Sequence, residues 1–114
     1  MKNIEQLKLK DNESTALQEL KRRLLERFSD AEIIIFGSKV RGDYDKESDI
    51  DLLILVDAEV NTALEDEIIN LAYDIELSCN VVFGLLIDSK KNWNSEISRA
   101  MPIHWNVDRE GLPV

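Results

Sequence analysis

Two acidic residues at the start of an apolar run are the clearest candidates for chemistry in this sequence. Asp49 and Asp51 are separated by one residue, and the run Leu52 to Val56 follows them. Side chains alternate along a strand, so a strand beginning at Asp49 places both carboxylates on one face, with their Cα atoms roughly 7 Å apart. Two such carboxylates repel each other, and a divalent cation relieves the repulsion. Because Mg²⁺ prefers one or two carboxylates together with substrate phosphates, the pair predicts a magnesium site.

A second group of candidates follows the apolar run Ile33 to Phe36. Gly37 allows the backbone to approach a ligand closely, and the Ser38 hydroxyl and nearby N–H groups can hold phosphate oxygens. Lys39 and Arg41 supply positive charge, and arginine binds phosphate with a two-pronged geometry. Each piece alone is more often an ordinary turn or a solvated charge. A phosphate cradle beside a metal pair indicates transfer of a phosphoryl-type group, where positioning and charge neutralisation supply most of the catalysis.

The elements that position these residues follow from the apolar spacing and the turn residues. A helix is expected over 14–27, with Thr15 and Gln18 spaced as a capping box and Asp11, Asn12 and Ser14 as rival caps. The remaining expectations are a strand at 33–36, a loop at 37–48, a strand at 49–56, a helix starting near Asp57 or Asn61, a strand at 81–87, a helix at 89–101 ending before Pro102, and a turn with an extended end. This order predicts an α+β fold with a mixed β-sheet packed with helices.

Composition limits the class of protein. A chain of 114 residues suits a single domain over residues 1–114, and 44% hydrophobic with 32% charged residues argues against disorder. The formal charge of −9 counts against direct nucleic-acid binding and suits a metal or a basic protein partner. The apolar runs are too short to cross a bilayer, and no apolar signal region follows Met1, so a cytoplasmic location is expected. Cys79 is interpreted as a small apolar filler, and His104 as a surface or capping residue.

The stretch GSKVRGDYDKESDIDLLILV resembles the signature of minimal nucleotidyltransferase (MNT) domains of the DNA polymerase β superfamily, including MntA-type antitoxins. The block from Trp93 to Val114, with Arg109-Glu110-Gly111, is similar to the C-terminal segments of such domains. The resemblance implies the polymerase β-like nucleotidyltransferase fold and a reaction that needs Mg²⁺. A nucleoside monophosphate, AMP if ATP is the substrate, would be transferred to an acceptor hydroxyl with release of pyrophosphate.

The resemblance also implies roles for individual residues. Gly37 and Ser38 would hold the triphosphate, and Arg41 would assist them. Asp49 and Asp51 would bind magnesium and form the catalytic pair.

The same resemblance implies a partner. Many MNT proteins pair with a HEPN-family toxin, act as its antitoxin and adenylylate it. The superfamily usually carries a third carboxylate on the strand after the crossover helix, but Val81 to Ile87 contains no acid, and Asn80, Asp88 and Glu76 lie only at its borders. Three hypotheses therefore stay open: a nucleotidyltransferase with a two-carboxylate site, a catalytically weak or inactive module that neutralises a partner by binding, and an acidic domain without nucleotide chemistry.

Overall fold

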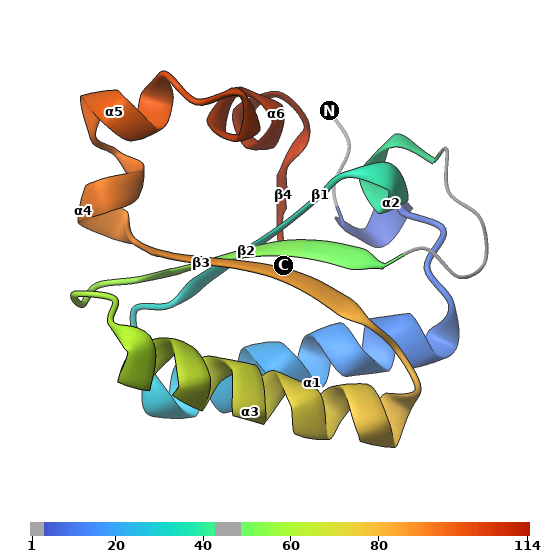
Figure 1. The fold of residues 1–114 in the computed structure, drawn as a ribbon. Helices are drawn as coiled ribbons and strands as arrows, with labels where there is room; N and C mark the ends of the chain where they lie inside the picture. The colour runs from blue at the N-terminus through green and yellow to red at the C-terminus, as the bar shows by residue number, and fades with distance from the viewer. Residues whose placement is uncertain (1–3, 43–48) are drawn as a thin grey trace.

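A four-stranded mixed sheet forms the centre of the protein (Figure 1). The structure is a computed structural model that describes residues 4–42 and 49–114. The strands are β1 (Glu32–Phe36), β2 (Ile50–Val56), β3 (Phe83–Ser89) and β4 (Leu112–Pro113), in the order β3-β2-β1-β4. The β1–β2 and β1–β4 pairs are antiparallel, and the β2–β3 pair is parallel. The α+β class with a mixed sheet, expected from the sequence, is confirmed.

Helices cover both faces of this sheet. The helical elements are a short 3₁₀ turn (Ile4–Gln6), α1 (Asp11–Arg27), α2 (Ser38–Arg41), α3 (Thr62–Cys79), α4 (Lys90–Trp93), α5 (Glu96–Arg99) and α6 (Pro102–Glu110). In Figure 1, α1 and α3 lie together on one face, while α4, α5 and α6 lie on the other. No helix within the described residues is long and apolar enough to cross a membrane.

Strand β2 is apolar on both faces because each face packs against helices. Ile50, Leu52 and Ile54 belong to the core cluster beneath α1 and α3. Leu53 and Leu55 point to the opposite face and pack in a second cluster with residues of α4 and α6. A strand between two helical layers must bury both faces, which explains the near-continuous apolar run. Asp51 shares the face of Leu53 and Leu55 by alternation, so it is the polar exception at the start of that face.

The ends of several elements differ from the sequence-based expectations. Helix α1 begins at Asp11, and the Glu13 side chain accepts a hydrogen bond from the Lys10 N–H (2.9 Å). The expected capping box of Thr15 and Gln18 is therefore wrong, because both residues already lie within the helix. Asn61 does cap α3, and its side chain accepts from the Leu64 N–H (2.9 Å).

The C-terminal third contains more helix than the sequence predicted. The single helix expected over 89–101 is two short helices, because Ser95 interrupts it and accepts from the Ser98 N–H (3.2 Å) to cap α5. Pro102 begins α6 instead of following the last helix, since proline suits the first turn, where its missing N–H has no helical partner. The expected extended end is present as β4, which adds to the edge of β1.

Candidate active site

The carboxylate of Asp51 lies in a slot between two glycines. Asp51 pairs in register with Phe36 on β1 and with Gly84 on β3. A Cβ added at Gly84 would lie 2.8 Å from Asp51 Oδ1, and one added at Gly37 would overlap Oδ2. Only residues without a side chain leave room for the acid on both sides. The turn after β1 and the acid at the start of β2 are therefore brought together, as the sequence predicted.

The turn itself is a single tight helical turn. Gly37 has a φ of 81°, a left-handed conformation that favours glycine, and its carbonyl accepts from the N–H groups of Val40 (3.0 Å) and Arg41 (3.1 Å). Ser38 begins this turn and is half-buried. The part of the predicted loop from Ser38 to Arg41 is thus helix α2, while residues 43–48 lie outside the described residues. The first N–H groups of a helical turn have no partner within it, which leaves α2 suited to anionic oxygens.

Among the described residues, three charged groups act on the Asp51 carboxylate in the slot. Burial raises the pKa of the Asp51 carboxyl above its usual value, and the charges of Asp49 and Glu110 raise it further, while the Arg41 guanidinium opposes them. Asp49, directly before β2, is exposed to solvent. Three carboxylates beside one guanidinium leave an excess of negative charge. The electrostatics of the site therefore favour a bound cation.

Lys39 does not belong to this site. Its side chain is buried, and its ammonium forms an ion pair with Glu13 of α1, with Nζ and Oε2 2.7 Å apart. The expectation that Lys39 supplies charge to phosphates is wrong, because α2 directs this side chain into the interior. Arg41, in contrast, is half-exposed at the end of the same turn.

Glu110, the last residue of α6, is a site residue that the sequence analysis did not assign. Its Oε1 accepts from the Gly37 N–H (3.0 Å), and both carboxylate oxygens accept from Arg41 Nη1 (3.0 and 3.2 Å). The only sequence signal was the Arg109-Glu110-Gly111 block, which gave no indication of where Glu110 would lie. Glu110 lies 73 residues from Gly37 and 69 from Arg41 along the chain, which explains why spacing could not reveal these contacts.

No third carboxylate lies on β3 next to the acidic pair. The β3 residue paired with Asp51 is Gly84, and Asp88 pairs with Leu55, four residues further along β2. Asn80 ends α3 in a left-handed conformation, and Glu76 accepts from the Phe83 N–H (3.1 Å). Within residues 4–42 and 49–114, no three His, Cys, Asp or Glu side chains form a group that could hold a metal ion. A cation held by Asp49 and Asp51 would thus rely on further oxygen ligands, such as substrate phosphates, which suits Mg²⁺.

His104 is buried, so the expected surface position is wrong, whereas its contact with the last carbonyl of α4 fits the expected capping role. Its ring stacks on Trp93, with centroids 4.2 Å apart, and Nε2 lies 2.9 Å from the Trp93 carbonyl oxygen. Nδ1 lies 3.0 Å from a carboxylate oxygen of Asp108. His104 therefore joins α6 to α4 beneath the second core cluster. Trp105, on the other side of α6, is largely exposed.

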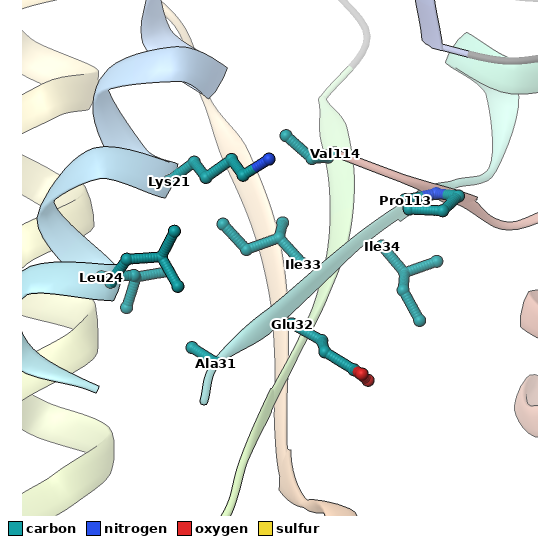
Figure 2. A pocket seen from close by; sticks show the side chains of 9 residues that line it. Lys21, Leu24, Ala31, Glu32, Ile33, Ile34, Pro113 and Val114 are labelled. Atoms are coloured by element: carbon teal, nitrogen blue, oxygen red, sulfur yellow. The ribbon is translucent and has the colours of Figure 1, made fainter. Parts of the chain in front are cut away.

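A separate pocket of about 350 Å³ lies between α1 and the edge formed by β1 and β4 (Figure 2). Figure 2 shows Ile33 pointing from β1 toward α1, while Ile34 points to the other side of the strand. The lining is mainly apolar and includes Leu24 and Val114, with Lys21 and Glu32 as its charged members. Neither the acidic pair nor the turn after β1 lines this pocket, so it is not part of the candidate active site.

Comparison with known proteins identifies the family of this chain. The family described as nucleotidyltransferase domain matches residues 17–103, so the chain belongs to that family. A protein of Methanocaldococcus jannaschii named "putative protein adenylyltransferase" is 35% identical over 102 residues, covering 88% of this chain and 95% of the relative. A second protein of that name and organism is 40% identical over 58 residues, covering 51% of this chain and 59% of the relative.

A solved structure supports the fold assignment. The crystal structure of a "putative nucleotidyltransferase" superposes with a TM-score of 0.51 at 26% identity, covering 86% of this chain and 96% of the other. The fold is therefore that of the nucleotidyltransferases, as the resemblance implied.

Proposed function

We propose that this protein transfers AMP from ATP to a hydroxyl group of a protein partner in a Mg²⁺-dependent reaction. The observation that carries the proposal is the Asp51 carboxylate, held between Gly84 and the Gly37 turn. This arrangement sets a cation ligand directly beside a turn suited to phosphate oxygens. The names of the two relatives from Methanocaldococcus jannaschii support a protein as the acceptor.

Different residues of this chain would bind the metal and the phosphates. Asp49 and Asp51 would hold Mg²⁺ together with phosphate oxygens of the nucleotide, and the excess negative charge around Asp51 favours this cation. When bound, the metal would neutralise the charge that develops on the transferring phosphoryl group. Gly37 and Ser38 would hold the triphosphate through the start of α2, and Arg41 would contribute its guanidinium.

The transfer requires a defined exchange of bonds. The acceptor oxygen forms a bond to the α-phosphorus of ATP while the bond from that phosphorus to the β,γ-diphosphate breaks, and pyrophosphate leaves. The hydroxyl proton must pass to solvent or to a base. Strand β3 offers no carboxylate beside Asp51, so this protein would depend on the partner or on water for that step.

The expected partner is a HEPN-family toxin in the cytoplasm, with this protein as its antitoxin. The formal charge of −9 supports docking onto a basic protein surface and disfavours a nucleic-acid acceptor. The absence of a β3 carboxylate beside Asp51 supports a second candidate, in which the protein neutralises its partner by binding alone.

Incubation with ATP labelled at the α-phosphate separates the two candidates. The purified protein, the product of a neighbouring HEPN gene and Mg²⁺ are combined, and label on the partner is measured. Transfer that is lost in Asp51→Asn but retained in Glu96→Gln, which removes a charge from exposed α5, supports the enzyme. Stable complex formation without label in Mg²⁺ or Mn²⁺ contradicts it and favours neutralisation by binding.

A further inference from the structure

The Glu110 carboxylate contacts Gly37 and Arg41, two of the residues proposed to lie at the nucleotide's phosphates. Its Oε1 accepts from the Gly37 N–H, and the carboxylate pairs with Arg41 Nη1 at 3.0 and 3.2 Å. The Glu110 side chain is only 11% exposed, whereas that of Arg41 is 49% exposed. The pair is thus anchored at its carboxylate end and open to solvent at its guanidinium end.

The backbone holds Glu110 firmly at the joint between α6 and β4. Gly111 follows it, and a Cβ there would lie 2.5 Å from the Val107 carbonyl oxygen and 2.7 Å from Ile34 Cγ2. Leu112 then pairs with Ile35, and the Val114 N–H donates to the Ile33 carbonyl (2.9 Å). Glu110 therefore reaches the turn from a close-packed joint fixed to β1, which makes it suited to orienting other groups.

We propose that Glu110 is a positioning residue of the nucleotide site, acting through Arg41. This inference rests on the proposed function and extends it. A guanidinium is a planar fork of five N–H donors, and Glu110 contacts it at Nη1. Holding the fork at that nitrogen fixes its plane before the nucleotide arrives. Phosphate binding then orders less of a long, flexible side chain, which strengthens binding. The hydrogen bond from the Gly37 N–H to Glu110 also fixes the backbone at the start of the turn.

A competing role for Glu110, as an anion that the triphosphate displaces, predicts the opposite change in ATP affinity. Glu110 adds negative charge near Asp51, so it could act as a stand-in anion that the triphosphate has to displace. Removing its charge would then tighten ATP binding. A positioning role requires that the same change weaken it.

Calorimetry of ATP binding in the presence of Mg²⁺ decides between the two roles. Glu110→Gln retains a carbonyl oxygen for the Gly37 N–H but removes the charge that orients Arg41. We expect about tenfold weaker binding, in the range of a charge-assisted hydrogen bond. In an Arg41→Ala background, the same change should have almost no further effect. Glu96→Gln on α5 is the matched control and should bind as the wild type does.

Each of the following results would overturn the inference. Binding that is unchanged or tighter in Glu110→Gln contradicts positioning. An equal loss in the Arg41→Ala background means that Glu110 does not act through Arg41. A wild type that fails to bind ATP with Mg²⁺ removes the proposed function and this inference together, whereas the first two results remove only the inference. If Glu110→Gln does not fold, Glu110→Asp retains the charge with a shorter reach, and affinity equal to that of the wild type would contradict the proposal.

Discussion

Adding one methyl group at Gly84 should displace the Asp51 carboxylate while leaving the fold intact. The backbone of Gly84 lies in β3 without a positive φ, so alanine fits its conformation. Alanine in place of glycine within a strand stabilises the folded state by roughly 0.5–1 kcal/mol. The atom nearest to the new Cβ is Asp51 Oδ1, at 2.8 Å, which is the flexible end of a side chain.

The expected size of the effect follows from that distance. An ordinary contact between such atoms begins at about 3.4 Å, so the carboxylate must move by about 0.6 Å. Gly37 bounds the other side of the slot, where a Cβ would overlap Oδ2, so the space for this movement is limited. Mg²⁺ requires ligand oxygens at about 2.0–2.1 Å in near-octahedral geometry. We expect Gly84→Ala to weaken Mg²⁺-dependent ATP binding at least about tenfold, or about 1.4 kcal/mol.

The assay combines thermal unfolding with calorimetry of ATP binding in Mg²⁺. Gly84→Ala should melt at the same or a higher temperature than the wild type and bind ATP more weakly. In an Asp51→Asn background, where the carboxylate charge is already absent, Gly84→Ala should cause no comparable further loss. Gly42→Ala is a contrasting variant, because its φ of 80° strains alanine by about 1–2 kcal/mol, although no atom of the described residues lies within 4 Å of the added Cβ. Wild-type ATP affinity in Gly84→Ala would refute the reasoning.

Two further predictions concern buried charge. Because the folded-state pKa of Asp51 is raised, its ionisation opposes folding, so any stability it contributes is present at acidic pH and lost as pH rises through the folded-state pKa. Asp51→Asn should therefore have a higher free energy of unfolding than the wild type at pH 7 without metal. The gain should be less than about 1 kcal/mol because the group is partly exposed, and it should vanish near pH 3. A lower melting temperature of Asp51→Asn at pH 7 would contradict this prediction. Lys39→Met leaves the Glu13 carboxylate buried without its partner and should destabilise the fold by about 3–5 kcal/mol in urea unfolding, whereas Lys39→Met with Glu13→Leu should recover most of it. A double variant as unstable as the single one would show that the loss does not come from the unpaired charge.

The sequence predicted the acidic pair and the strands because these depend on local patterns. An apolar run closed by Gly37 and a second run opened by Asp51 define two strands without knowledge of the rest of the chain. Alternation then gives the face of Asp51, and the structure agrees with it. The strand limits shifted by only one or two residues, since hydrogen-bond pairing decides the last residue of a strand.

The contacts between distant segments could not be predicted in the same way. Lys39 and Glu13 are 26 residues apart, and no periodicity specifies where a side chain in a short turn will point. Glu110 reaches Gly37 only because α6 and β4 return the chain to the edge of β1. From sequence, Pro102 predicts the end of the preceding helix, but proline also suits the first turn of a new helix, and only the packing of α6 decides between the two.

A crystal of the protein with Mn²⁺ and a non-hydrolysable ATP analogue tests the central claim most directly. Mn²⁺ has oxygen preferences close to those of Mg²⁺, and its anomalous signal locates the ion. We expect one ion bound by carboxylate oxygens of both Asp49 and Asp51, with the triphosphate lying against Gly37 and Ser38. An ion elsewhere, or a triphosphate bound away from this turn, would contradict the account.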